Sequence, residues 1–375
     1  MKIICVGDLF LGGDAEFKKP EIRSTAYFSA DLRIANLEHP ISEEGKPEDK
    51  STLYSTKKAI EHLKSLKINV VNLANNHIHD LGGVGLKNTT KNLRKNNIRF
   101  VGAGYNLNEA QRAVKLTDNL YILGFCDFDK KYLSQVKIAT PTSEGVNPLR
   151  LENVKTCLRR LPVDAKVILY IHWGKEHVWF PPASDRLIMQ ELLRLPEIVL
   201  IIGSHAHQMQ PGYRMEEKTG FFCLGNFLFS NFHIKPRTQI LPRNEALDGL
   251  VKRTTSVYHS VKQITYKTWR LKNRISYGVE FDTVSRKIMP VYYLQDKKYP
   301  VVKQCSGWQL IAIKIFDNLL SIFYRAPTKI YGVLQSTENF VCDILWNISV
   351  LRVKLRHEGM KKVALSIWRI VKHVR

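Results

Sequence analysis

The sequence predicts an α/β fold with buried strands, and two observations support this. Over residues 1–232, short apolar runs of strand length alternate with segments of helical periodicity, which is the pattern of βαβ units. The chain of 375 residues is also 44% hydrophobic, with 21 glycines and 15 prolines. That composition supplies a sizeable core and excludes a mainly disordered or collagen-like chain.

The expected elements of this part follow in order along the chain. Strands are expected at residues 2–6, 34–37 and 69–73. A helix is expected at 57–67, where Ile60, Leu63 and Leu66 share one face, and another at 85–97, where Leu86 and Leu93 lie seven apart. Further strands are expected at 99–102, 121–125, 167–171, 198–202 and 221–224.

The chain changes character after residue 232. Residues 233–277 lack clear periodicity and are interpreted as a basic insertion, whereas 276–281 and 288–293 flank a polar turn and predict a hairpin. After Pro300 the pattern predicts helices without strands. We therefore expect a main domain over 1–300, containing the insertion 233–277, and a helical basic C-terminal region over 301–375.

Cysteine usage and the N-terminus bear on the compartment. The six cysteines are scattered without a C-x-x-C pair, which favours reduced core thiols over a disulfide framework or a zinc knuckle. The apolar run at residues 3–6 is too short for a signal peptide, and no run reaches 18 apolar residues. We expect a cytoplasmic protein.

Polar side chains follow nearly every expected strand of the core. Asp8, Glu38, Asn75-Asn76-His77, His172 and His205-Ala206-His207 each come at or just after the end of an apolar run. Side chains at the carboxyl ends of strands converge at one edge of an α/β sheet. Carboxylate, amide oxygen and imidazole ligands without thiolate suit Mn²⁺, Fe, Zn²⁺ or Mg²⁺. The pattern favours a metal site, and a two-metal hydrolytic site requires a bridging carboxylate together with several histidines.

Seven ordered motifs extend this interpretation. They are GDLFLGG (7–13), NLEHP (36–40), NLANNHIHDLG (72–82), GAGYNLNEA (102–110), IHWGKEH (171–177), GSHAHQMQP (203–211) and LGNFLF (224–229). Together they resemble the CapA family of poly-γ-glutamate capsule synthesis, of the calcineurin-like metallophosphoesterase superfamily. The resemblance covers residues 1 to about 232 and resumes near 276–293. It implies a four-layer α/β/β/α sandwich with one or two divalent metal ions, Mn, Fe or Zn, at its loop edge.

The resemblance also implies a role for each matching residue. Asp8 would bind one metal, Glu38 would bridge both, and His207 would return to the first. Asn76, His172 and His205 would hold the second metal. His77 would stand beside the site as proton donor or oxyanion stabiliser, oriented by Asp80. The sequence departs from the superfamily at Phe10, where a histidine is usual, so the first metal site is expected to be weak or empty.

Four further residues are candidates for substrate contact. Trp173 follows the expected ligand His172 and would floor a groove, with an ordinary core or rim aromatic as the alternative. Glu176 and His177 follow on the same loop, where a solvated loop is the alternative. Asn226 occupies a motif position without an evident role.

The positive charge is concentrated in two segments. The net charge is +23, of which residues 233–277 and 301–375 supply +8 each. This balance indicates an anionic polymer or a phosphate-bearing substrate as partner. Residues 360–374 also form an apolar stripe beside basic residues, which suits either packing on the main domain or peripheral contact with an anionic membrane at its inner face. No nucleic-acid partner is expected, because no helix-turn-helix or aromatic-rich basic sheet occurs.

Two functions remain open on the sequence. The first is a metal-dependent hydrolase in capsule or surface-polymer biosynthesis, in which metal-activated water attacks a phosphoester or an acyl or amide bond. The second is a non-catalytic metal-binding accessory protein that binds an anionic polymer or scaffolds a polymer synthase complex.

Overall fold

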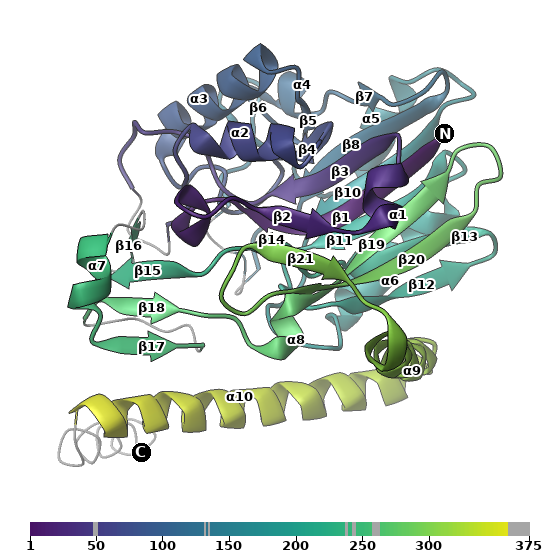
Figure 1. The fold of residues 1–375 in the computed structure, drawn as a ribbon. Coiled ribbons are helices and arrows are strands. Elements are labelled where there is room, and N and C mark those ends of the chain that lie inside the picture. The colour runs from purple at the N-terminus through teal and green to yellow at the C-terminus, as the bar shows by residue number, and fades with distance from the viewer. Residues whose placement is uncertain are drawn as a thin grey trace, which may run out of the picture.

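Two β-sheets pack face to face to form the body of the protein (Figure 1). The computed structural model describes residues 1–47, 52–130, 133, 136–236, 239–241, 245–256 and 263–358, with the backbone alone at 239–241, 245, 353, 354, 357 and 358. The first sheet has the order β2 (Glu21–Arg23), β21 (Val301–Gln304), β20 (Ile288–Gln295), β19 (Ile275–Asp282), β1 (Lys2–Phe10), β3 (Leu32–Leu37), β4 (Val70–Asn72), β5 (Arg99–Val101), and β14 (Asn226–Phe229) also pairs with β1.

The second sheet has the order β12 (Gln210–Met215), β13 (Lys218–Cys223), β11 (Ile198–Ser204), β10 (Lys166–His172), β8 (Leu120–Cys126), β7 (Val114–Lys115). Strands β8, β10, β11 and β13 are parallel, as are β1, β3, β4 and β5 of the first sheet. The expected strands are thereby confirmed to within a few residues.

Side-chain alternation along the strands separates the layers. In β1, Ile3 and Cys5 pack between the sheets, whereas Ile4 and Val6 face the other way, toward α2 (Lys58–Ser65) and α3 (Gly82–Lys95). In β10, Ile168 and Tyr170 face the first sheet. The alternate residues Val167, Leu169 and Ile171 face α5 (Leu151–Arg159) and α6 (Ala183–Arg194). Because successive side chains of a strand point to opposite faces, each sheet is covered on both sides. The α/β/β/α sandwich is therefore confirmed.

The basic insertion forms a small sheet of its own. Strands β16 (Gln239–Leu241), β15 (Phe232–Lys235), β18 (Thr265–Lys267) and β17 (Arg253–Thr255) pair in this order, with α7 (Glu245–Leu250) between β16 and β17. Helix α8 (Leu271–Arg274) then leads back into β19. The hairpin expected near 276–293 is confirmed as the antiparallel pair of β19 and β20.

The short remaining elements lie in connections. They are η1 (Gly13–Glu16), α1 (Thr25–Ser29), α4 (Leu107–Ala110), and the two-stranded sheet of β6 (Ala103–Gly104) and β9 (Gly145–Val146). All six cysteines are free, and five of them are buried, which fits the expected core thiols.

The C-terminal region begins with a strand, so the prediction that only helices follow Pro300 is wrong. Strand β21 pairs with β20 on one side and with the edge strand β2 on the other, so it is part of the first sheet. The helices α9 (Gly307–Tyr324) and α10 (Thr328–Glu358) come after it and lie along the lower edge of the body in Figure 1. The division at residue 300 stays a prediction, and the stripe at 360–374 lies outside the described residues. Neither α9 nor α10, nor any other described helix, combines the length and apolarity needed to cross a bilayer.

Candidate metal centre

The polar residues that end the core strands meet at one edge of the sandwich. Asp8 lies in β1, Glu38 directly follows β3, and Asn76 lies on the turn after β4. His172 ends β10, and His205 and His207 follow β11 on the next loop. Because these parallel strands end at the same edge of each sheet, packing the two sheets brings all six side chains together.

A bulge in β1 aims Asp8 at this edge. Cys5 pairs with Ile34 and Asp8 pairs with Asn36, so three steps along β1 match two along β3. Without that irregularity Asp8 would face away from Cys5, because side chains alternate along a strand. The neighbouring Gly7 has no room for a side chain, since a Cβ there would lie 1.8 Å from the carbonyl oxygen of Gly225.

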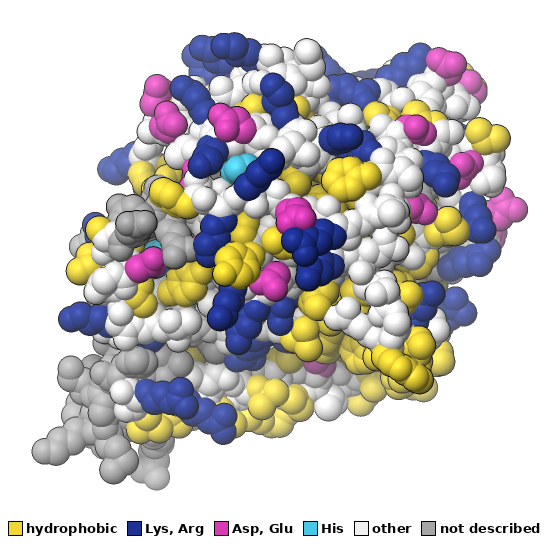
Figure 2. All heavy atoms as spheres, viewed as in Figure 1, with side chains coloured by type: hydrophobic (Ala, Val, Ile, Leu, Met, Phe, Trp, Pro, Cys, Tyr) yellow, Lys and Arg dark blue, Asp and Glu magenta, His cyan; other side chains and the backbone are white. Residues whose placement is uncertain are grey.

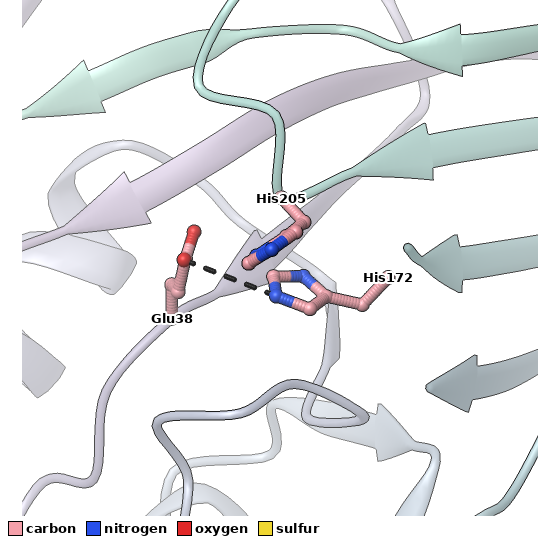
Figure 3. A group of neighbouring side chains, drawn as sticks. All are labelled: Glu38, His172 and His205. Atoms are coloured by element: carbon pink, nitrogen blue, oxygen red, sulfur yellow. Dashed lines mark ion pairs between the residues drawn. The ribbon is translucent and has the colours of Figure 1, made fainter. Parts of the chain in front are cut away.

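Two groups of candidate metal ligands share one carboxylate. Glu38, His172 and His205 form the first group, and Asp8, Glu38 and His207 form the second, with the ligand atoms of each group within 4.8 Å of one another. Figure 3 shows Glu38 facing the two imidazoles of the first group, with His172 Nε2 4.0 Å from Glu38 Oε1. The same Oε1 lies 3.5 Å from His207 Nε2 in the second group. Glu38 thus has the position of a bridging ligand.

Neighbouring amides hold the ligands in place. Asn76 Oδ1 lies 2.8 Å from His172 Nε2, which makes Asn76 a further candidate ligand of the first group. Asn36 Nδ2 donates to Asp8 Oδ1 at 2.9 Å and lies 3.5 Å from Glu38 Oε2. Asn226 Oδ1 lies 2.9 Å from His207 Nδ1, which leaves Nε2 of that ring toward Glu38.

The loop after β11 has unusual backbone angles. His205 and His207 have φ values of 91° and 50°, and His177 on the loop after β10 has a φ of 63°. Non-glycine residues pay roughly 1–3 kcal/mol for such conformations, which cluster at functional sites. The left-handed angles turn two imidazoles of one tripeptide toward different ligand groups.

Burial sets the charge of the ligands. It raises the pKa of Asp8 to about 7, and burial, followed by the nearby charge of Asp8, raises the pKa of Glu38 well above its ordinary value. Burial lowers the pKa of His172 and His205 well below the ordinary value and that of His207 to about 3. The imidazoles are therefore neutral, as metal binding requires.

These residues fit a divalent cation. Glu38 Oε1 and both ring nitrogens of His205 are buried and have no hydrogen-bond partner among the described residues. Buried polar atoms without partners are rare and call for an explanation such as an ion. Aimed at one another, a carboxylate oxygen and neutral imidazoles are a suitable donor set for Mn, Fe or Zn.

The second group, which contains Asp8 and His207 of the metal site expected to be weak, offers fewer ligands than the first. Phe10, at the position where the resemblance led us to expect a histidine, is fully buried in an aromatic cluster. Its ring lies 5.2 Å from those of His39 and Phe229 and 5.6 Å from that of Phe232. No ligand comes from this position, so the second group consists of Asp8, Glu38 and His207.

His77 and Asp80 form a pair beside the ligands. His77 Nδ1 lies 2.6 Å from Asp80 Oδ2, and the same oxygen accepts the backbone N–H of Leu53 at 2.6 Å. Asp80 is fully buried, whereas 11% of the His77 side chain is exposed. His77 belongs to neither of the two ligand groups found among the described residues.

The comparisons with known proteins concern the part of the chain that contains these residues. The model of the family described as "Bacterial capsule synthesis protein PGA_cap" matches residues 2–231, which include every candidate ligand. The chain belongs to this capsule synthesis family. The resemblance drawn from the seven motifs is thereby confirmed.

Two curated relatives match the same part. The PGA biosynthesis protein CapA of Bacillus subtilis (strain 168) is 27% identical over 252 residues, which are 63% of this chain and 65% of the relative. The capsule biosynthesis protein CapA of Bacillus anthracis is 28% identical over 230 residues, 58% of this chain and 54% of the relative. The chain thus spans less than two-thirds of either relative. The solved structure of TT1561 of Thermus thermophilus aligns with a TM-score of 0.39 at 8% identity, over 77% of this chain and 97% of that one.

The structure corrects two of the expected substrate contacts in this member of the family. Trp173 is only 1% exposed, stacks on Phe222, and donates its indole N–H to the Phe222 carbonyl at 2.9 Å. Its side chain packs in the core beneath α6, because successive side chains at the end of β10 point to opposite faces and that of His172 points to the metal centre. Asn226 is fully buried and orients His207, so it is a positioning residue.

Glu176 and His177 remain candidates for substrate contact. They line an open pocket of about 410 Å³ between the loop after β10, α8 and α10, together with Lys175, Arg270 and Lys272. The ring of His177 lies 5.9 Å from that of His207. The pocket therefore adjoins the second ligand group.

The insertion adds two residues that sequence reasoning missed. The ring of Trp269 lies 5.7 Å from that of His207, and Lys267 Nζ lies 4.7 Å from the centre of the Trp269 ring. Burial lowers the pKa of Lys267 to about 7. A contact between distant segments of the chain brings these residues to the site. The local sequence around them therefore has no motif or periodicity that would have predicted their place. Asn36, which was also missed, lies inside the NLEHP motif and was within reach of the same reasoning.

Proposed function

We propose that this chain is a metal-dependent hydrolase that acts in capsule or surface-polymer biosynthesis. The observation that carries the proposal is the place of Glu38 in both ligand groups. A bridging carboxylate holds two cations close together, which is the arrangement of two-metal hydrolytic sites. Membership of the capsule synthesis family supports the polymer as the setting.

The residues of the two groups would divide the cations between them. Glu38, Asn76, His172 and His205 would hold one cation, and Asp8, Glu38 and His207 the other. When bound, such cations activate water and polarise the phosphoester, acyl or amide bond to be cleaved. Mn, Fe or Zn suits this donor set.

His77 is suited to donate a proton to the leaving group. Asp80 contacts Nδ1 of His77 and so fixes the orientation of the ring. Its other nitrogen, Nε2, takes no part in the contact with Asp80. A histidine oriented by a carboxylate is a common general acid. In this role His77 protonates the leaving oxygen or nitrogen, and Asp80 stabilises the ring in the required direction.

The pocket beside the second group suits an anionic substrate. Lys175, Arg270 and Lys272 line it, and Lys272 Nζ donates to the carbonyl of His177 at 2.8 Å. Lys175 pairs with Asp343, which also lines the pocket, whereas neither Arg270 nor Lys272 forms an ion pair with a described acidic residue. A phosphate-bearing substrate or a carboxylate-rich polymer such as poly-γ-glutamate would meet complementary charge here.

A substrate panel tests the proposal. Metal-depleted protein is supplied with Mn²⁺, Fe²⁺ or Zn²⁺ and assayed on phosphomonoesters, phosphodiesters and γ-glutamyl amides. We expect turnover of one class that depends on added metal and is lost in Glu38→Gln but kept in the exposed control Glu21→Gln. Turnover of no class with any of these metals would contradict the proposal.

A second candidate function is favoured by Phe10, which provides no metal ligand at the position where a histidine was expected. With only three ligands in one group, the chain would bind a single ion and serve as an accessory protein that binds an anionic polymer or scaffolds a synthase complex. Elemental analysis separates the two functions, because two ions per chain support catalysis, whereas one or none supports the accessory function. The cytoplasmic location stays a prediction in both.

A further inference from the structure

Helix α9 is apolar on two opposite faces. One face is buried against the body through Ile313, Asp317, Leu320 and Tyr324, which are three or four residues apart. The opposite face carries Trp308, Ile311, Ile315, Leu319 and Ile322, which are 46–85% exposed. A surface helix normally turns its polar side to water. The outward face of α9 does the reverse.

Helix α10 repeats this arrangement over a greater length. Its inner side contacts the body through the buried Tyr331 and through Glu338, which accepts the backbone N–H groups of Trp179 and Phe180. Its outer side carries an apolar stripe that is 38–67% exposed: Ile330, Val333, Phe340, Val341, Ile344, Ile348 and Leu355. A helix of 31 residues is roughly 46 Å long. Figure 2 shows hydrophobic side chains along both helices at the lower edge of the molecule.

The exposed charges around these stripes are mostly positive. Lys314, Arg325, Lys329, Arg352 and Arg356 are exposed, and none of them forms an ion pair within the described ranges. Each acidic residue of the two helices whose side chain is described contacts the body, although Asp343 is itself exposed. Asp317 accepts from Tyr277 and Tyr292, and Asp343 lies 3.9 Å from Lys175.

We propose that the outward faces of α9 and α10 form a docking surface for an anionic lipid membrane. An apolar helical stripe flanked by Lys and Arg lies in the plane of a bilayer surface, with its apolar side chains at the headgroup boundary. Anionic headgroups attract the flanking cations within a Debye length. The exposed Trp308 at the start of α9 has the amphipathic ring that favours this boundary.

The charges argue for lipid over a second copy of the chain. Pairing this surface with itself would bring uncompensated cations against one another, which is unfavourable. Docking on lipid leaves the metal centre free, because its ligands end the strands of the sandwich and the docking stripes face away from the body. The surface would hold a hydrolase beside a membrane, and the inference stands whether or not the chain is catalytic.

Sedimentation with vesicles tests the docking surface on the full chain. We expect sedimentation with phosphatidylglycerol–phosphatidylcholine vesicles and little with phosphatidylcholine alone. Part of the binding should persist at high salt, because burial of the stripe does not depend on charge. The combined variant Ile315→Asp, Ile322→Asp, Ile344→Asp should bind at least tenfold more weakly. Val163→Asp, at a fully exposed apolar position on the body, is the matched control and should bind like the wild type.

Two further measurements locate the contact. Lys329→Glu with Arg352→Glu should lower the preference for anionic vesicles, whereas Lys91→Glu, on the exposed side of α3, should not. Brominated lipid should quench the wild-type tryptophan emission more than that of Trp308→Phe. All these side chains are exposed, so a matched melting temperature shows that folding is intact. A wild type that ignores both kinds of vesicle overturns the proposal, as does self-association that the triple variant abolishes without any effect of lipid.

Discussion

Asn226 orients the ring of His207, with its Oδ1 2.9 Å from Nδ1 of that ring. The other ring nitrogen, Nε2, is thereby directed to Glu38 Oε1 at 3.5 Å. Asn226 faces Asp8 across the parallel pair of β14 and β1. Asn226 of the LGNFLF motif thus positions a ligand of the second group through one hydrogen bond.

Asn226→Leu should therefore weaken metal binding at the second group. The ring of His207 loses its acceptor, and removing such a partner typically costs 10–100-fold in metal affinity. Titration with Mn²⁺ should show a weakened step for one ion and an unchanged step for the other. Asn92→Leu, a half-buried amide on α3, is the control. Unchanged binding of both ions in Asn226→Leu would show that the hydrogen bond does not position the ligand.

Glu38 should be the least replaceable ligand. A bridging carboxylate holds two cations that otherwise repel, so Glu38→Gln should lose bound metal more completely than His207→Ala, which affects only one group. Elemental analysis of both variants after the same dialysis checks this. Equal retention of metal in the two variants would rule out the bridging assignment.

The sequence was sufficient for most of the ligand set because of a simple geometric rule. Asp8, Glu38, His172 and His205 each lie at or close to the end of a parallel strand, and parallel strands of one sheet end at a shared edge. The alternation of side chains along β10 also determines which layer Trp173 faces. His172 has the direction of Ile168 and Tyr170, so the next residue, Trp173, must face the opposite layer.

The rest of the site depends on contacts that leave no local pattern. Lys267 and Trp269 reach His207 only because the small sheet of the insertion folds against the body. Irregular spacing and a run of basic residues predicted no strand there. The strand β21 was missed for a related reason, because its four residues pair with partners far along the chain.

His77 should be separable from metal binding. It pairs with Asp80 and belongs to neither ligand group, so His77→Asn should keep the full metal content. If His77 protonates the leaving group, kcat should fall roughly 10²–10⁴-fold on the substrate identified by the panel. Loss of metal in this variant would make His77 a ligand, and wild-type rates would exclude a role in the reaction.

Lys267 should make the stability of the metal-free protein depend on pH. Its side chain is almost fully buried, and burial lowers its pKa from 10.5 to about 7. Between these two values the unfolded chain holds a proton on Lys267 that the folded chain has released. The free energy of unfolding therefore rises with pH from about 7 to 10.5, and below about 7 the buried ammonium costs on the order of a few kcal/mol.

Lys267→Met should remove this dependence, because Met retains the length of the side chain without its charge. In metal-free protein the variant should be more stable than the wild type at pH 6.5, and the difference should shrink at pH 9.5. Chemical unfolding at both pH values measures the two free energies. Lys287→Met, at an exposed lysine in the turn between β19 and β20, is the control and should follow the wild type. A difference between wild type and Lys267→Met that is the same at both pH values would show that Lys267 keeps its proton throughout this range.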